Sequence, residues 1–310
     1  MDAITAFLGG PRAKDAFVVR SLLSSPWSIR IQDDAPLTVV AMVRGTGWLS
    51  TDLGDAHPLH TGEVLIVSGG FHYTVSDELG APPQVVIHPG QRCTTPDGES
   101  VTASMTLGVR TWGNDPAGPT VMLTGTYTTD GEVGRRLLDS IPPVIVVEAI
   151  GATAAIVDLL EREIEGEQPG HGLVLDRLVD LLLIGALRTW FADPRVRLPA
   201  GYAAMSDPVI GPALRLIQHE AHEPWTVASL ARRVGLSRAA FAARFTEAVG
   251  EPPMRFLNSW RLALAADLLR DPDVTVSSVA RDVGFTSPYT FSTAFKRHYG
   301  KSPSDHRRAA

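Results

Sequence analysis

The stretch "SVARDVGFTSPYTFSTAFKRHYGKSP" at residues 278–303 decides the fold of this chain, because it is the second copy of one pattern. The first copy is "SLARRVGLSRAAFAARFTEAVGEPP" at residues 229–253. Positions from the serine of the turn onward match fifty residues apart, and positions before it match forty-nine apart. The second copy therefore has one extra residue, Thr286, in its turn. One such copy is a weak signal, but two copies in register are a strong one.

The turn of each copy carries residues that suit the join between two helices. Gly235 and Gly284 follow the first helix, where the chain needs a positive φ and glycine adopts it at little cost. Ser237 and Ser287 come next, and a serine hydroxyl there accepts a hydrogen bond from an amide of the second helix. Each copy is therefore predicted to be a helix-turn-helix, whose second helix enters the major groove of DNA.

The second helix of each copy is expected to have a buried face and an outward face. Phenylalanines four residues apart mark the buried face, namely Phe241 with Phe245 and Phe291 with Phe295. The opposite face is basic and carries Arg238, Arg244, Lys296 and Arg297. A purely structural role for the phenylalanines does not compete with DNA binding by the outward face.

The segment "MRFLNSWRLALAADLLRDPD" at residues 254–273 joins the two copies and has apolar residues at helical spacing. It predicts one long connecting helix that holds the two units at a fixed separation. Two recognition helices about one DNA turn apart, roughly 34 Å, would read two successive major grooves on one face of the duplex.

The charge is divided unevenly along the chain. Residues 1–200 contain 14 Lys and Arg against 24 Asp and Glu, a net charge of −10, whereas residues 201–310 contain 14 against 10, a net charge of +4. A basic C-terminal third behind an acidic body is typical of a nucleic-acid-binding end on a non-binding body, although plain surface variation gives the same pattern.

The composition sets broad limits on the class of protein. Hydrophobic residues make up 44% and charged residues 20% of the 310 residues, as in an ordinary globular protein of about two domains. Cys93 is the single cysteine, which excludes an intrachain disulfide and leaves oxidation or an intermolecular bond. The first residues lack a targeting pattern, and the longest apolar run, residues 178–187, is too short for a bilayer. We therefore expect a soluble cytoplasmic protein with no membrane association and no cofactor.

The text changes from strand to helix near residue 141. Residues 21–128 hold short runs rich in valine, isoleucine and aromatic residues, bounded by glycine, proline and aspartate, which predicts an antiparallel sandwich or barrel. Residues 153–165 and 173–193 then read as helices, and the second is apolar around most of its circumference. Two such helices suit an antiparallel pair at a subunit interface. Residues 194–208 read as a linker.

The last hundred residues resemble the DNA-binding domain of AraC/XylS-type transcription regulators. The segment "VARDVGFTSPYTFSTAFKRHYGKSPSDHRR" at residues 279–308 is similar to the C-terminal signature of that family. The N-terminal part resembles the cupin-type sensor found in one branch of the family. The points of similarity are "SSPWSIRI" at 24–31, "GEVLIVSGGFHYTV" at 62–75 and "LLDSIPPVIVV" at 137–147.

The resemblance implies an α+β multidomain fold in three parts. These are a cupin-like β-barrel or sandwich as sensor domain at residues 1–140, a helical dimerisation and linker region at 141–200, and an all-α DNA-binding domain with two helix-turn-helix units at 201–310. The implied function is that of a sequence-specific regulator that responds to a small molecule or a stress signal. It would bind double-stranded promoter DNA as a homodimer and recruit or block RNA polymerase.

The recognition helices depart from the family in one respect. Family members often carry an outward arginine two residues after the first core aromatic residue, where this chain has Ala243 and Thr293. Paired arginine bonds are the strongest readers of guanine, so affinity is expected to depend on phosphate contacts and DNA shape, with more discrimination by the second helix. The candidate DNA-binding residues are Arg232, Ser237, Arg238, Ala239, Ala242, Ala243, Arg244, Ser287, Tyr289, Ser292, Thr293, Lys296 and Arg297.

A metal-dependent cupin enzyme, tethered to DNA by the C-terminal domain, is the competing hypothesis. Many cupin enzymes hold a metal with two histidines one residue apart, but His57 and His60 are three apart and point to opposite faces of an extended strand. With Glu63 and His72 they depart from the enzymatic spacing, so no metal site is expected. A nucleoid-type protein that binds DNA without sequence preference is a third possibility.

A small β-barrel can enclose one small molecule, so the sensor is expected to have a ligand cavity. Strand-borne aromatic and polar side chains are the candidates to line it, each with a surface or core position as its alternative. They are Arg44, Trp48, His72, Tyr73, His88, Trp112 and Tyr127.

Overall fold

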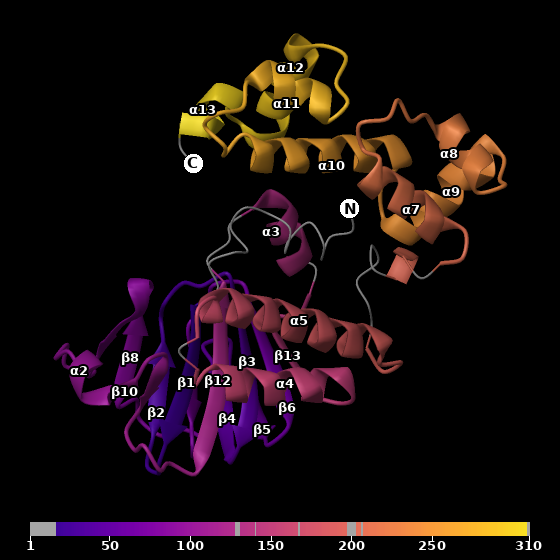
Figure 1. Ribbon diagram of the computed structural model, residues 1–310. Coiled ribbons are helices and arrows are strands. Elements are labelled where there is room, and N and C mark those ends of the chain that lie inside the picture. The colour runs from indigo at the N-terminus through magenta and orange to yellow at the C-terminus, as the bar shows by residue number, and fades with distance from the viewer. Residues whose placement is uncertain are drawn as a thin grey trace. The chain divides into compact units, whose positions relative to one another are not determined.

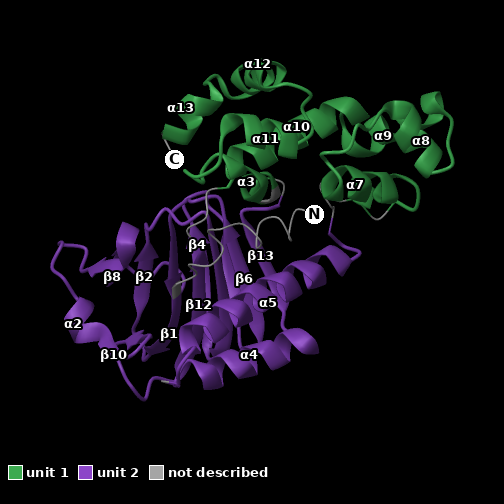
Figure 2. Cartoon of the chain, turned by 45° about the horizontal axis from the view of Figure 1, so that its top comes forward, with its two compact units in different colours: residues 1–10, 130–140, 197–310 green, residues 11–129, 141–196 purple. Residues whose placement is uncertain are grey.

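The computed structural model describes residues 17–127, 131–139, 141–166, 168–196, 203–205 and 207–308. The chain forms two compact units, shown in different colours in Figure 2. Unit 2 comprises residues 11–129 and 141–196, and unit 1 comprises residues 1–10, 130–140 and 197–310. Figure 1 labels most of the helices and strands of each unit.

Unit 2 is a sandwich of two β-sheets, as the sequence predicts. The first sheet has seven strands in the order β10-β11-β1-β12-β3-β6-β13, and the second has six in the order β5-β4-β7-β2-β8-β9. Neighbouring strands are antiparallel except for the pairs β1–β11 and β2–β8. The strands are β1 (Phe17–Leu23), β2 (Ser28–Ile31), β3 (Leu37–Arg44), β4 (Thr46–Thr51), β5 (Ala56–His60), β6 (Glu63–Ser68), β7 (Tyr73–Ser76), β8 (Val85–His88), β9 (Arg92–Thr94), β10 (Thr106–Gly108), β11 (Thr111–Gly113), β12 (Thr120–Tyr127) and β13 (Val144–Glu148).

Side chains along each strand of the first sheet point alternately to its two faces, one toward the second sheet and one toward the helices. In β12, Met122 packs in the core between the sheets, while Gly125 and Tyr127 face the helix α5 (His171–Ala192). A Cβ atom on Gly125 would lie 2.5 Å from a methyl group of Val179, so glycine allows this helix to approach the sheet closely. Buried leucine, isoleucine and valine side chains fill the space between the sheets, together with Trp27.

Of residues 141–200, expected as a dimerisation and linker region, those up to residue 196 belong to unit 2, and the dimerisation role stays a prediction. Their first element is the strand β13, which pairs with β6 and so extends the seven-stranded sheet. The helices α4 (Ala152–Glu163) and α5 then pack on each other, and α5 lies against β1, β3, β6 and β13 (Figure 1). Of the expected linker at 194–208, residues 197–202 and 206 lie outside the described residues.

Two short helical elements lie in unit 2, namely η1 (Pro89–Gln91) and α2 (Thr102–Met105).

Unit 1 is helical and contains both repeats. Within the described ranges, no helix combines the length and apolarity that crossing a membrane requires. The helices of unit 1 are α3 (Glu132–Leu138), α7 (Ile210–His219), α8 (Val227–Arg233), α9 (Arg238–Val249), α10 (Pro253–Leu268), α11 (Val276–Asp282), α12 (Pro288–Tyr299) and α13 (Pro303–Arg308).

Candidate DNA-binding interface and ligand cavity

Both repeats form the predicted helix-turn-helix. Gly235 and Gly284 have φ of 71° and 83° and follow α8 and α11. The hydroxyl of Ser237 accepts a hydrogen bond from the amide of Ala240 at 3.2 Å, and Ser287 caps α12 in the same way. The first helix of each helix-turn-helix also starts with a capping box, at Thr226 and at Thr275, which was not predicted from the sequence.

The phenylalanine pairs lie in the cores of the two helix-turn-helix units, as predicted. Phe241 and Phe245 are fully buried with ring centroids 5.6 Å apart, and Phe291 and Phe295 are fully buried at 5.5 Å. Because these pairs fix one face of α9 and of α12 toward the core, the opposite faces are turned to solvent.

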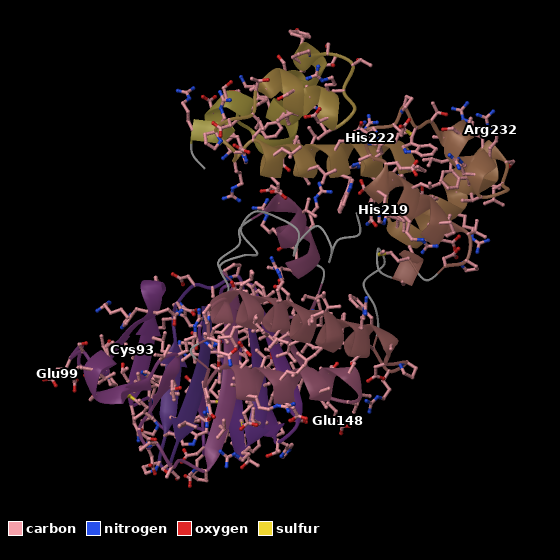
Figure 3. All side chains as sticks on the ribbon, in the orientation of Figure 1. Cys93, Glu99, Glu148, His219, His222 and Arg232 are labelled. Carbon is pink, nitrogen blue, oxygen red and sulfur yellow. The ribbon has the colours of Figure 1, made fainter. Side chains whose placement is uncertain are left out.

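The candidate DNA-binding side chains gather on those outward faces. Tyr289 has 81% of its surface accessible, while Ala242, Ser287 and Ser292 are half-buried. Arg232 lies at the outer surface of unit 1 at the end of α8 (Figure 3). The exposed candidates are Arg232, Ser237, Arg238, Ala239, Ala243, Arg244, Tyr289, Thr293, Lys296 and Arg297.

Two arginines near this surface are already engaged with other side chains. Arg244 forms an ion pair with Asp207, with Nη2 3.0 Å from Oδ2. The guanidinium of Arg233 lies 5.7 Å from the ring centroid of Trp225. A phosphate would have to compete with these partners, so Arg238, Lys296 and Arg297 are the stronger candidates for phosphate contacts.

Arg261 on the connecting helix α10 joins the two helix-turn-helix units. Its side chain is almost completely buried; Nε donates to the carbonyl of Ala221 at 2.6 Å and Nη2 to the carbonyl of Glu223 at 2.7 Å. These two carbonyl groups precede the first helix-turn-helix in the sequence. The turn of the second helix-turn-helix packs against the same segment. A Cβ atom on Gly284 would lie 2.5 Å from the carbonyl oxygen of His222 and 2.8 Å from Nη2 of Arg261.

A second polar contact, which is half-buried, attaches α3 to the same helix. The carboxylate of Asp267 on α10 accepts hydrogen bonds from the amides of Glu132 at 2.5 Å and Val133 at 3.1 Å. Burial raises the pKa of this carboxyl group, and the two amides oppose that rise. Val133 packs with Trp260 and other buried residues of unit 1. In the sequence, α3 lies between β12 and β13 of the sandwich, although it packs with the DNA-binding helices.

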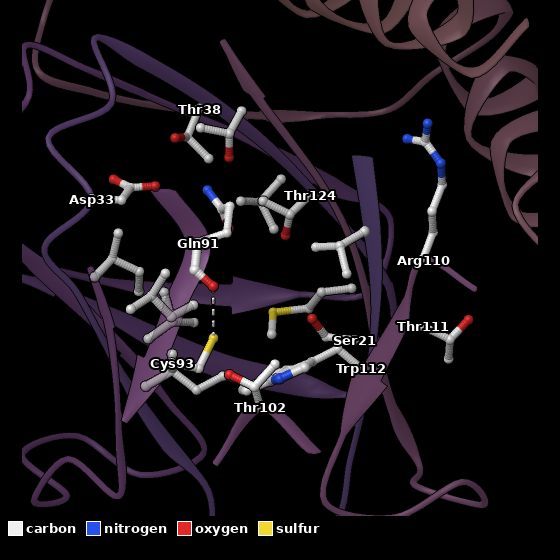
Figure 4. A pocket seen from close by; sticks show the side chains of 18 of the residues that line it. Ser21, Asp33, Thr38, Gln91, Cys93, Thr102, Arg110, Thr111, Trp112 and Thr124 are labelled. Atoms are coloured by element: carbon white, nitrogen blue, oxygen red, sulfur yellow. Dashed lines mark hydrogen bonds between the residues drawn. The ribbon is translucent and has the colours of Figure 1, made fainter. Parts of the chain in front are cut away.

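A partly open cavity of about 290 Å³ lies between the two sheets of the sandwich (Figure 4). Alternating residues of several strands point into it, such as Val19 and Ser21 of β1 and Thr124 and Thr126 of β12. The other lining side chains are mostly apolar or carry a hydroxyl group. The full set of these others is Ile29, Ile31, Asp33, Thr38, Val40, Tyr73, Val75, Ile87, Gln91, Cys93, Thr102, Thr106, Arg110, Thr111, Trp112 and Met122.

Tyr73 and Trp112 line this cavity as predicted, but five of the seven expected ligand residues do not. His88 and Tyr127 each adjoin a lining residue of the same strand and so face the other side of their sheet, while His72 lies just before β7. His72 lies 3.2 Å from Asp34, His88 lies 3.0 Å from Thr94, and the hydroxyl of Tyr127 donates to Asp180 of α5. Arg44 is exposed at the end of β3, and Trp48 adjoins the core residue Leu49.

Cys93 is a buried lining residue of the cavity. Its thiol donates to the carbonyl of Gln91 at a sulfur–oxygen distance of 3.6 Å, and burial raises the pKa of the thiol. A thiol with a raised pKa is mostly protonated at neutral pH and is a poor nucleophile. The residue is thus placed to contact a ligand rather than to react readily.

The histidines considered for a metal site are dispersed. His60 lies at the exposed end of β5, where its amide donates to the carboxylate of Glu63 at 2.7 Å. Among the described residues, no group of three His, Cys, Asp or Glu side chains is placed to hold a metal ion.

The two glycines of the turns provide a matched pair for a test. Both need a positive φ, so alanine strains the backbone at either position. A Cβ atom at Gly235 would meet open space, whereas one at Gly284 would collide with backbone at His222. We predict that Gly284→Ala lowers the free energy of unfolding by about 2 kcal/mol or more and Gly235→Ala by about 1 kcal/mol. Denaturant unfolding of both variants measures the difference, and equal losses would contradict the packing described for Gly284.

Comparison with known proteins assigns the same two parts. A family model described as cupin matches residues 2–192, and one described as a helix-turn-helix domain matches residues 230–309. An AraC-like transcription regulator of Streptomyces antibioticus is 30% identical over 91% of this chain and 90% of its own. The HTH-type transcriptional regulator MtrA of Neisseria gonorrhoeae is 27% identical over 94% and 92%.

Among solved structures, the DNA-binding domain of the transcription factor AdpA in complex with a target DNA is 35% identical. The match covers 34% of this chain and 93% of that domain, with a TM-score of 0.32. The relatives that match over nearly the full length are transcription regulators and not metal-dependent cupin enzymes. The chain therefore belongs to the AraC-type DNA-binding transcription regulators that join an N-terminal cupin domain to a C-terminal helix-turn-helix domain.

Proposed function

We propose that this regulator recognises specific promoter sequences in double-stranded DNA and that a small molecule bound in the sandwich cavity controls it. The outward faces of α9 and α12, held by one connecting helix, are the observation that carries the first half of the proposal. The cavity carries the second half, because it is large enough for a small ligand and lies inside the cupin domain.

The two recognition helices would contribute unequally to sequence preference. The outward face of α9 presents Ala239 and Ala243, whose methyl groups can contact thymine but make no hydrogen bonds. The face of α12 presents Tyr289 and Thr293, whose hydroxyl groups can bond base edges. Discrimination between base pairs would therefore come mainly from α12, and Arg238, Lys296 and Arg297 would supply phosphate contacts.

This difference is tested by selecting preferred sites from a random DNA library with single variants. We expect Thr293→Ala or Tyr289→Phe to relax the preference at one base pair by roughly threefold to tenfold, since each removes a hydrogen-bonding hydroxyl group. A change in the other recognition helix, Ala242→Ser, should leave the selected site unchanged. If Ala242→Ser alters the site and the α12 variants do not, the assignment is wrong.

Competition with random DNA at stated salt concentrations distinguishes sequence-specific binding from a nucleoid-type role. Binding that depends on phosphates alone weakens steeply as salt rises and is competed equally by any duplex. The proposal requires the selected site to outcompete random DNA at every salt concentration.

The cavity proposal has an internal reporter, because Cys93 is the single cysteine of the chain and lines the cavity. We expect a thiol reagent to label Cys93 at least about tenfold more slowly in the folded protein than in urea, since its thiol is buried with a raised pKa. A ligand in the cavity should slow labelling further.

The control for this labelling experiment moves the thiol to the surface. A double variant with Cys93→Ser and Ser100→Cys has its thiol at an exposed position, so its labelling should not respond to the ligand. An effector that changes DNA binding but leaves the labelling rate of Cys93 unaltered would place its site elsewhere.

The position of α3 supports a route from the cavity to the DNA-binding helices. Met122, Thr124 and Thr126 of β12 line the cavity, and α3 follows this strand in the sequence. The same helix packs on α10 and is capped by Asp267. A change in β12 on ligand binding would therefore be passed along the chain to the helix that spaces the two DNA-binding units.

The remaining partners follow from this role. We infer a homodimer, because α4 and α5 expose large apolar side chains, and dimerisation would cover them. The exposed apolar side chains of these two helices are Leu159, Leu173, Val174 and Leu181.

A regulator bound at a promoter would recruit or block RNA polymerase, and such a protein acts in the cytoplasm.

A further inference from the structure

We propose that the cavity selects an uncharged, mainly apolar molecule that carries a hydrogen-bond acceptor, and that Trp112 Nε1 donates to this acceptor. The inference rests on the proposed sensing role of the cavity and specifies the chemical class of its ligand. It follows from the lining, from the charges around it and from one unpaired donor.

The lining favours a hydrocarbon body. Side chains of Val19, Ile29, Val40, Val75 and Met122 come from both sheets and face one another across the cavity. Burying apolar ligand surface against such side chains is favourable in proportion to its area. A volume of about 290 Å³ is close to the lower end of the range for small-molecule sites, so the ligand is small.

The charged side chains disfavour an anion. Asp33 lies at one end of the cavity, where burial raises the pKa of its carboxyl group. Among the described residues Arg110 is the one cation that lines the cavity, and it turns its guanidinium away from the other labelled side chains in Figure 4. Its Nη1 lies 3.5 Å from the carbonyl of Val18, and its Nη2 lies close to Gly172 at the start of α5. A buried carboxylate or phosphate would therefore lose hydration without gaining a paired cation.

Trp112 supplies the polar specificity. The ring lines the cavity, and its Nε1 is buried without a hydrogen-bond partner among the described residues. The strand β11 holds it in place, with Trp112 opposite Ser21 of β1 and Thr106 of β10. A buried donor without a partner is costly, and an indole Nε1 can donate but not accept. A ligand acceptor such as a carbonyl or ether oxygen would remove that cost.

The test uses three probes that share a naphthalene body. They are 2-acetylnaphthalene, with a neutral acceptor, 2-isopropylnaphthalene, with a hydrocarbon group of similar shape, and 2-naphthoate, an anion at pH 7.5. Protection of Cys93 from thiol labelling in the full-length protein reports the occupancy of the cavity. We expect the ketone to protect at a concentration about fivefold lower than the hydrocarbon, as one neutral hydrogen bond gives, and the anion to protect least.

Trp112→Phe keeps an aromatic ring and removes the donor, so it should abolish the advantage of the ketone and leave the hydrocarbon unaffected. Trp48→Phe is the matched control, because Trp48 does not line the cavity, and it should preserve the order of the three probes. The order measured with the unmodified protein is a test by itself if Trp112→Phe does not fold.

Three results would overturn the inference: protection by 2-naphthoate equal to that by the ketone, an unchanged ketone advantage in Trp112→Phe, or no protection by any probe. Affinity for the selected DNA site is measured on the same preparations. If DNA binding is normal while the probes fail, the ligand class is wrong and the DNA-binding role stands. If DNA binding is absent, the proposed function itself fails.

Discussion

The fixed spacing of the two helix-turn-helix units along α10 is the constraint on which the DNA-binding end of this protein depends. A single helix determines the distance, but a helix alone leaves each unit free to rock about its contact. Arg261 adds a second connection, since it donates to two carbonyls in front of the first helix-turn-helix and lies beside the turn of the second. Removing one partner of such a buried charged contact leaves unpaired polar groups. This cost favours the position of the Arg261 side chain.

The sandwich depends on a different constraint, the alternation of side chains along its strands. In β12 the even-numbered residues from Met122 to Thr126 face the cavity, while Gly125 and Tyr127 face α5. One strand therefore forms part of the wall of the cavity and also supports a covering helix. The helix α3 follows this strand in the sequence and packs with the DNA-binding helices.

Most of the C-terminal unit could be predicted from sequence, because the signals there are local: two glycines, two capping serines and two phenylalanine pairs at fixed spacing. The lining of the cavity could not, since it depends on which face of each strand turns inward, and a shift of one residue reverses that choice. His72, His88 and Tyr127 were expected to face the cavity and lie one position from residues that do. Arg261 and Asp267 were missed because their partners are backbone groups far away in sequence.

The central claim is tested most directly by moving the two half-sites of a selected operator relative to each other. Duplexes with and without an insertion of about five base pairs, half a helical turn, place the second groove on the same or the opposite face of DNA. If α10 holds the two units rigidly, the insertion should reduce the affinity of the protein to that for a single half-site. Equal affinity for both duplexes would contradict the account.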